Sequence, residues 1–207
     1  MAKNQIITLL ENLSRDDISL VGGKGANLGE MIKAGLPVPG GFVVLTNSYK
    51  RFIEVNGLDK RIAIILESVD DSNPKELERA SKTIQDLFEK GEIPQDIIEE
   101  IDRNYQLMGS PEVVVRSSAT AEDLPGTSFA GQYDTYLNVK GEEQLYNYIK
   151  KCWASLWNQR ALSYRLKHGI DNKHLAHGVV VQGLINAEKS GILFTANPVN
   201  GRRDQML

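Results

Sequence analysis

The sequence predicts an α+β protein, because its two halves show different apolar patterns. Residues 47–109 carry apolar side chains at helical spacing, interrupted by caps and glycines, whereas residues 110–207 contain short β-rich segments around one long helical stretch. We expect residues 1–46 to join the second region in a mixed or antiparallel sheet with packed helices. Residues 47–109 are expected to form a helical subdomain against that sheet.

The first 46 residues predict two strands separated by a helix. Strands are expected at residues 6–9 and 42–45, and two prolines favour an extended approach to the second. A glycine turn, Gly22–Gly25, precedes the helix, and Gly35 is a suitable C-terminal stop. The apolar face of this helix is expected to consist of Leu28, Met31 and Ile32.

Four helices are expected in the next region. Candidate caps for the first are Thr46, Asn47 and Ser48. Asn73 followed by Pro74 combines a cap with a first-turn proline and opens a helix that ends at Gly91, and Pro94 begins the last helix. The four apolar stripes are Tyr49, Phe52 and Ile53; Ile62, Ile65, Leu66 and Val69; Leu77, Ala80, Ile84, Leu87 and Phe88; and Ile97, Ile101 and Tyr105.

The second half of the chain predicts strands around one long helix. The β-rich segments are Val113–Val115, Tyr133–Val139, Gly178–Gln182 and Ile192–Thr195. The apolar face of the helix is formed by Leu145, Ile149, Cys152, Trp153 and Leu156. The polar segment 186–190 suits a hairpin connection. Residues 204–207 resemble a strand that has begun without a closing turn, so we expect an incomplete domain.

Composition and charge exclude several functional classes. A net charge of -3 argues against nonspecific nucleic-acid binding, which needs a positive surface to replace counterions. The N-terminal residues do not resemble a signal peptide, and no apolar run has the length of a membrane span, so we expect a cytoplasmic protein without membrane contact. Cys152 is the single cysteine, which excludes an intramolecular disulfide and fits a reducing compartment.

Two positively charged residues are candidates for gripping a polyphosphate. Arg116 follows three valines at the end of an expected strand, and its guanidinium offers a fixed fork of donors to phosphate oxygens. Lys24 lies in the glycine turn at a helix N-terminus, although the surrounding residues are not a Walker motif. The alternatives are a tight turn with a solvated Lys24, and an ion pair of Arg116 with Glu122 or Asp123.

Smaller polar residues complete the candidate set. Residues 126–131, which include Thr127 and Gly131, suit either a flap that closes over phosphates or a plain hairpin loop. Ser117, Ser118 and Thr120 can bond phosphate or cap the local backbone. Gln182 at the end of a strand can read the exocyclic amine of a base, or can simply be solvated.

The histidines and tryptophans are not nominated for chemistry. His168, His174 and His177 do not have the spacing of a metal motif and lack a serine or acidic partner, so surface positions are expected for them. Trp153 and Trp157 lie four residues apart and are expected in the core or at a domain interface. We therefore predict no metal ligand within the chain.

The chain contains four long motifs in this order: VGGKGANLGEM, GLPVPGGFVV, VVVRSSATAEDLPGTSFAGQYDTYLN and SGILFTANPV. Together they resemble the phosphoenolpyruvate synthase and pyruvate phosphate dikinase family. The resemblance covers nearly the whole chain and implies the N-terminal part of an ATP-grasp nucleotide-binding domain; rifampicin phosphotransferase is similar over the same motifs. It implies that ATP is cleaved and that a phosphoryl or pyrophosphoryl group passes to a histidine on a separate swivelling domain.

The resemblance also implies roles for individual residues. Lys24 and Arg116 match the phosphate-contacting catalytic pair, Gly131 and Thr135 match positions near the nucleotide, and Gln182 matches an adenine-side position; Ser117 and Thr127 complete the expected ATP contacts. The family's Mg²⁺ ligands and another arginine are expected beyond residue 207. We therefore expect that the chain alone does not complete turnover.

The function of the whole protein has three candidate forms. The first is a phosphoenolpyruvate synthase, whose swivelling phosphohistidine domain and acceptor-binding domain lie outside this chain. A rifampicin-phosphotransferase-like antibiotic kinase shares the motifs, and the acceptor domain would separate the two. The third is a noncatalytic nucleotide-binding module. The sequence leaves the oligomeric state open.

Overall fold

The protein contains a five-stranded antiparallel sheet with the strand order β1-β2-β5-β3-β4. The computed structural model describes residues 5–70, 73–120, 134–170 and 175–207. The strands are β1 (Ile7–Leu9), β2 (Gly41–Val44), β3 (Val113–Ala119), β4 (Thr135–Val139) and β5 (His177–Gly183). The α+β expectation with an antiparallel sheet is confirmed.

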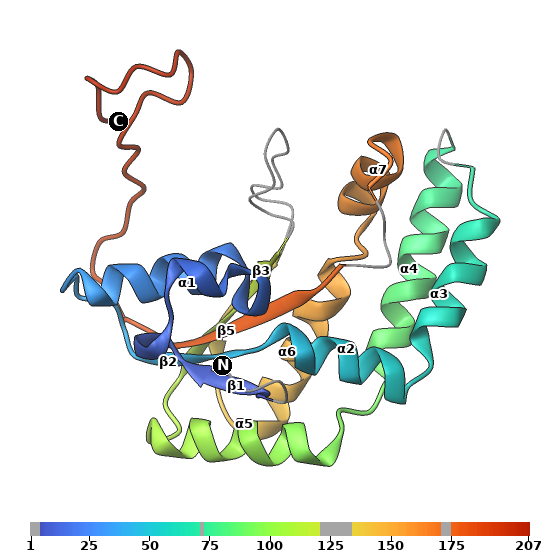
Figure 1. The fold of residues 1–207 in the computed structure, drawn as a ribbon, viewed down its shortest axis with the longest axis horizontal. Helices are drawn as coiled ribbons and strands as arrows, with labels where there is room; N and C mark the ends of the chain where they lie inside the picture. Colours follow the sequence, from blue (N-terminus) through green and yellow to red (C-terminus); the bar gives the residue numbers. More distant parts are fainter. Residues whose placement is uncertain (1–4, 71–72, 121–133, 171–174) are drawn as a thin grey trace.

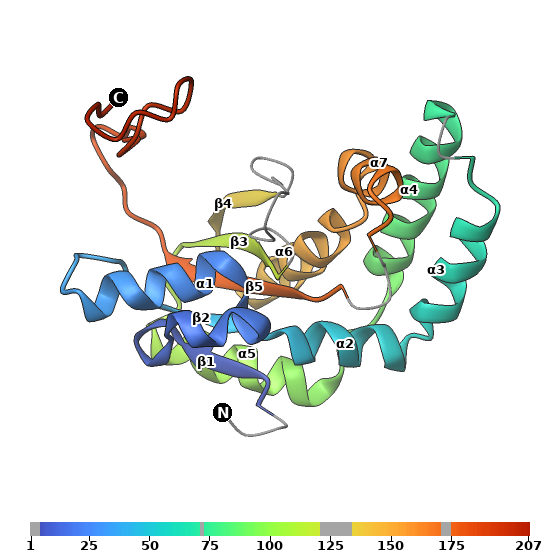
Figure 2. The same cartoon turned by 45° about the horizontal axis from the view of Figure 1, so that its top comes forward.

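Helices cover both faces of this sheet (Figures 1 and 2). The α-helices are α1 (Ile18–Lys33), α2 (Thr46–Val55), α3 (Leu58–Glu67), α4 (Pro74–Lys90), α5 (Gln95–Leu107), α6 (Glu142–Ser155) and α7 (Gln159–Lys167). Two short 3₁₀ helices, η1 (Leu10–Asn12) and η2 (Arg15–Asp17), precede α1. None of the helices in the described part of the chain is long and apolar enough to cross a membrane.

The two faces of the sheet belong to different apolar clusters. Val43 and Val180 pack with residues of α1, η1 and the segment after η1, which form the smaller cluster. The alternate residues of the same strands, such as Val44, Val179 and Val181, pack into the larger cluster with α2, α4, α5 and α6. Because side chains alternate along a strand, α1 lies on one face and α6 on the other.

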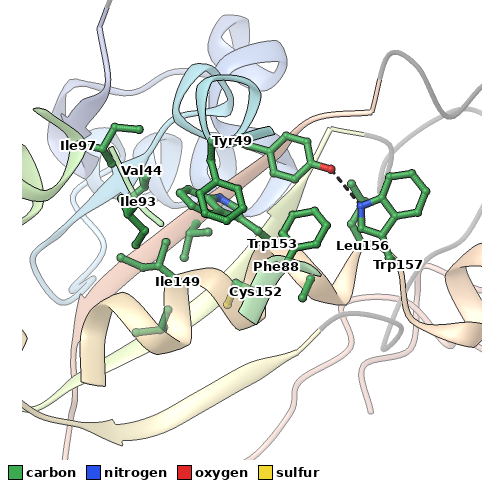
Figure 3. Packing of buried hydrophobic residues seen from close by; sticks show 14 of the residues in the cluster. Val44, Tyr49, Phe88, Ile93, Ile97, Ile149, Cys152, Trp153, Leu156 and Trp157 are labelled. Carbon is green, nitrogen blue, oxygen red and sulfur yellow. Dashed lines mark hydrogen bonds between the residues drawn. The ribbon is translucent and has the colours of Figure 1, made fainter. Parts of the chain in front are cut away.

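Aromatic side chains make up the middle of the larger cluster (Figure 3). The Phe52 and Trp153 ring centroids lie 5.0 Å apart, and Tyr49 stacks on Phe88 at 6.0 Å. Trp157 Nε1 donates a hydrogen bond of 3.1 Å to the Tyr49 hydroxyl. Both tryptophans are therefore core residues, as expected. This core joins the helices of residues 47–109 to the sheet, and the division into two subdomains stays a prediction.

Several local signals in the sequence act as expected. The Asn73 side chain accepts a hydrogen bond from Lys75 N at 3.1 Å and caps α4, which ends at Gly91. Gly35 has a φ of 75°, and α1 ends in a Schellman motif, since Gly35 N bonds Ile32 O and Leu36 N bonds Met31 O. Pro94 directly precedes α5. The structure confirms these helix boundaries, which were predictable because they depend on residues within a few positions of the helix end.

The expected caps of α2 are wrong. Leu45 occupies the cap position, and no side chain caps this helix. The Thr46 hydroxyl instead donates to Ser19 O and the Ser48 hydroxyl to Ile6 O, while Asn47 Nδ2 donates to Gln5 O. These three side chains therefore donate hydrogen bonds to backbone carbonyls of distant segments instead of capping the start of α2.

The expected strands near the C-terminus are also wrong. Residues 192–195 and 204–207 form no strand, and Ile192 and Leu193 are 81% and 68% exposed. The segment runs away from the sheet (Figure 1), so residues 186–190 do not connect two sheet strands. Phe194 and Leu207 exchange two backbone hydrogen bonds, at 2.8 and 3.1 Å, with each other. These apolar residues therefore do not form a strand, because no strand among the described residues pairs with them.

Two further differences concern helices. The long helical stretch is broken into α6 and α7, and Asn158 caps the second by accepting from Ala161 N at 2.8 Å. Met31 is 41% exposed, whereas small residues of α1 make its close contacts: Ala26 belongs to the cluster of Val43 and Val180, and a Cβ at Gly29 would lie 2.5 Å from Leu13 O. Large apolar residues are not needed where backbones approach this closely.

Replacing Tyr49 with phenylalanine should lower the free energy of unfolding by about 1–3 kcal/mol, because the buried Trp157 N–H loses its acceptor. Chemical denaturation of Tyr49→Phe measures the loss. Tyr148→Phe, which removes a hydroxyl from a half-buried ring on α6, is the control and should change stability by less than about 0.5 kcal/mol. Equal losses in both variants would contradict this account of the core.

Candidate functional site

Arg116 lies on the face of the sheet that α1 covers. In β3 it stands opposite Val180 of β5 and Thr135 of β4. Residues directly opposite each other in antiparallel strands share a face, and Val180 packs against α1. The structure therefore brings Arg116, Thr135 and the helix that carries Lys24 to the same side of the sheet.

Gln182 belongs to the same face. It pairs with Val114, so it lies diagonally from Arg116 across the β3–β5 ladder. Its side chain is 6% exposed, and Nε2 donates a hydrogen bond of 2.9 Å to Pro39 O. The alternative of a solvated Gln182 is not observed, because this bond holds the side-chain amide against the chain segment that leads into β2.

The Arg116 guanidinium has a buried donor that the described residues do not use. The side chain is half-buried, and its Nε finds no hydrogen-bond partner among the described residues. Buried donors are nearly always satisfied in folded proteins, so such an atom in a candidate site fits an anionic ligand. The alternative partners Glu122 and Asp123 lie outside the described residues.

The glycine turn rests directly on the end of β3. Gly22 has φ 74° and ψ 171°, a conformation that is almost restricted to glycine. A Cβ atom at this position would lie 2.2 Å from Ser118 O. On β5, a Cβ at Gly178 would lie 2.7 Å from Val21 O. Both glycines are therefore required for the close approach of the turn to the two strands.

The Lys24 ammonium acts on groups at this end of the sheet. Burial, followed by the charges of Lys24 and Arg165, lowers the pKa of His177 to about 3, while the Trp153 backbone acts in the opposite direction. Burial raises the pKa of the Cys152 thiol well above its ordinary value, although the Lys24 charge lowers it. Lys24 is half-buried rather than fully solvated.

The histidines are placed differently from each other. His177 is completely buried, so the expected surface position is wrong for it. Its place in β5, opposite Ala119, accounts for the burial. His168 is exposed, with its Nδ1 2.8 Å from Tyr164 O, and His174 lies outside the described residues.

One candidate does not lie on the α1 face, and two others fall outside the described residues. Ser117 points to the opposite face, where its hydroxyl donates a hydrogen bond of 3.0 Å to Asp134 O. Thr127 and Gly131 lie outside the described residues. Sequence reasoning did not identify Gly178 as a contact of the glycine turn. For the two serines a signal was available, because side chains alternate along a strand and Ser117 and Ser118 must therefore face opposite sides of β3.

The described residues do not suit a magnesium ion. They contain no group of three or more histidine, cysteine, aspartate or glutamate residues that could hold a metal. Mg²⁺ prefers carboxylate and phosphate oxygens, whereas Arg116 on the α1 face and Lys24 in α1 are cations. Two cationic groups favour an anion over a cation as their ligand.

Comparison with known proteins identifies the family. The model of the pyruvate phosphate dikinase AMP/ATP-binding domain matches residues 18–207. The chain belongs to this family. It is 47% identical over 98% of its length to a probable phosphoenolpyruvate synthase of Methanocaldococcus jannaschii. It is 45% identical, over 94% and 99% of its length, to a probable phosphoenolpyruvate synthase of Methanothermobacter thermautotrophicus and to a phosphoenolpyruvate synthase of Aeropyrum pernix.

These relatives are much longer than the chain. It covers 18% of the Methanocaldococcus jannaschii protein, 29% of the Methanothermobacter thermautotrophicus protein and 26% of the Aeropyrum pernix protein. The matched region includes the glycine turn, β3 and β5, which carry the candidate site. The family assignment and the site geometry therefore concern the same part of the chain.

Gly22→Ala should lower the free energy of unfolding by more than about 3 kcal/mol, because backbone strain adds to the collision with Ser118. Gly35→Ala is the control, since Gly35 also has a positive φ but a Cβ there meets nothing within 4 Å. Its expected cost is about 1–2 kcal/mol. Chemical denaturation compares the two, and equal costs would contradict the close contact of the turn with β3.

His177 should make the protein less stable as the pH falls. Its pKa is about 3 in the fold against an ordinary 6.5, so the unfolded chain binds the proton more readily. Its stabilising contribution is complete above pH 6.5 and decreases as the pH falls from 6.5 towards about 3. Between about pH 7 and about pH 5 the free energy of unfolding should decrease by about 2 kcal/mol.

Urea denaturation of the parent and of His177→Gln at both pH values checks this prediction. The variant should lose this part of the pH dependence, whereas His168→Gln, which changes an exposed histidine, should retain it. An unchanged pH dependence in His177→Gln would refute the assignment.

Proposed function

We propose that the chain binds ATP on the α1 face of the sheet, as the nucleotide-binding part of a phosphoenolpyruvate synthase. The observation that carries this proposal is that Arg116, Thr135 and Gln182 share the face of the sheet on which α1, the helix that contains Lys24, lies. The family match to an AMP/ATP-binding domain supports the nature of the ligand. A division into a helical subdomain near residues 47–109 and a sheet-containing subdomain near residues 110–207 with residues 1–46 belongs to the same proposal.

In this proposal, Arg116 and Lys24 act on the phosphates. The Arg116 Nε–H, which has no partner among the described residues, donates to a phosphate oxygen, and the guanidinium opposes the negative charge. The glycine turn directs the N-terminus of a helix, with Lys24 in its first turn, towards the same ligand. Phosphoryl transfer depends mainly on positioning and charge stabilisation, which these groups supply.

Gln182 and Thr135 are proposed to hold the rest of the nucleotide. One amide hydrogen of Gln182 is given to Pro39 O, which orients the side chain. The adenine amine is a donor, so the Gln182 atom that would receive it is the carbonyl oxygen Oε1. Thr135 is exposed on the edge strand beside Arg116, where its hydroxyl can reach a ligand above that side chain.

The complete reaction is proposed from the names of the relatives. They are phosphoenolpyruvate synthases, which favours pyruvate over an antibiotic as the final acceptor. The phosphoryl group would pass from ATP to a histidine on a swivelling domain and then to pyruvate, giving AMP, phosphoenolpyruvate and phosphate from ATP, pyruvate and water. Mg²⁺ would neutralise the triphosphate through ligands beyond residue 207. The histidine and acceptor domains also lie outside this chain.

Calorimetric titration with ATP, with and without Mg²⁺, tests the site. Lys24→Ala and Arg116→Ala should each weaken ATP binding at least about tenfold, because each removes a charge-assisted contact. Lys33→Ala at the other end of α1 and the exposed Arg103→Ala are matched controls, which should change the affinity less than about twofold. Circular dichroism confirms that each variant is folded.

The outcomes of this experiment are distinct. Equal affinities in the site and control variants would refute the placement of the phosphates, and no binding by the folded parent would refute ATP binding by this chain. A separate assay supplies the histidine domain of a relative together with labelled ATP. We expect no transfer of label by this chain alone, and transfer would contradict the need for residues beyond 207.

A further inference from the structure

The helix that carries Lys24 begins without a capping side chain of its own. Gly22 interrupts α1 with a non-helical φ of 74° and ψ of 171°, so a new helical segment starts at Gly23. Gly22 then occupies the cap position, where serine, threonine, aspartate or asparagine would accept a hydrogen bond from an early helical N–H. Glycine has no side-chain oxygen, and the N–H of Gly25, the third residue of this segment, needs an acceptor from elsewhere.

Ser118 of β3 supplies this acceptor. Gly25 N donates a hydrogen bond of 3.1 Å to Ser118 Oγ, a buried contact between residues 93 positions apart. Ser118 itself is 0% exposed. A serine in a strand therefore performs the function that a local cap residue performs in most helices.

The cap has to come from the strand because no side chain fits at position 22. A Cβ there would lie 2.2 Å from Ser118 O and 2.5 Å from Ser118 Oγ. Ser118, which accepts the hydrogen bond from Gly25, occupies the space that a side chain at position 22 would need. The missing side chain at Gly22 and the hydroxyl at Ser118 are thus two parts of one arrangement.

We propose that Ser118 is a positioning residue for the phosphate site, which it serves by fixing the glycine turn to β3. Ser118 and Arg116 lie two positions apart on the same face of this strand, so one strand carries both the guanidinium and the hydroxyl that holds the helix start. Lys24 immediately precedes Gly25, so this bond fixes the backbone from which the Lys24 side chain extends. The inference rests on the proposed ATP binding.

Ser117 is an internal control for this assignment. It is buried to the same degree and has the same hydroxyl, but it faces the opposite side of β3 and donates to Asp134 O. Ser117→Ala therefore removes one buried hydrogen bond from the same strand without touching the glycine turn. Ser118→Ala removes the bond to Gly25.

Two measurements on the folded 207-residue chain test the proposal. Amide hydrogen exchange should be about fivefold faster at Gly25 in Ser118→Ala, as expected for a lost helix cap, and unchanged there in Ser117→Ala. Calorimetry should give an ATP dissociation constant about five- to tenfold higher in Ser118→Ala, and within about twofold of the parent in Ser117→Ala. Ser118→Cys, with a similar size and a weaker acceptor, replaces Ser118→Ala if the alanine variant does not fold, and should change both quantities in the same direction.

Each outcome has one meaning. Faster exchange together with weaker ATP binding, both confined to the Ser118 variant, supports the proposal. If the parent binds ATP and the two serine variants bind it equally well, the positioning role of Ser118 is refuted while the proposed function stands. If the folded parent does not bind ATP, the proposed function fails and this inference fails with it.

Discussion

The close contact between the glycine turn and the ends of β3 and β5 is the constraint on which the candidate site depends. Gly22 and Gly178 leave no room for a Cβ atom, so the backbone of the turn lies against the strands themselves. A helix start held by backbone contact cannot shift as a helix resting on flexible side chains can. This contact sets where Lys24 stands relative to the sheet, and the sheet in turn sets the place of Arg116.

The same end of the sheet concentrates positive charge in a protein whose net charge is -3. Lys24 acts from the α1 side, and Arg165, which is completely buried with its guanidinium 5.1 Å from the Trp157 ring, acts from the α7 side. Both charges disfavour protonation of His177. An anion on the α1 face would meet a local field that the overall composition does not reveal.

Much of the fold was predictable because it depends on interactions between residues close in the sequence. The features that were not predictable depend on contacts between residues far apart in the sequence. Asn73 and Gly35 act within a few residues of their own position, so their roles were visible in the sequence. The Thr46 hydroxyl does not cap its own helix, because it donates a hydrogen bond to the backbone carbonyl of Ser19, which is distant in the sequence. For the site, the sequence and the family resemblance predict roles for Lys24 and Arg116, and these roles stay a prediction. The roles of Ser117 and Ser118 depend on which face of β3 each residue occupies, and that is decided by pairing with β5.

The alternation along β3 has a consequence for how this protein tolerates insertions and deletions. Seven consecutive residues of β3 pair with β5 without interruption, whereas the pairing with β4 shifts between Val113 and Val115. A single residue inserted within β3 would invert every side chain beyond it, sending Arg116 into the apolar layer beneath and exchanging the two serines. Length changes in this region are therefore expected on the β4 side, where the ladder already accommodates an irregularity, and the β3–β5 pair should keep a constant length among functional relatives.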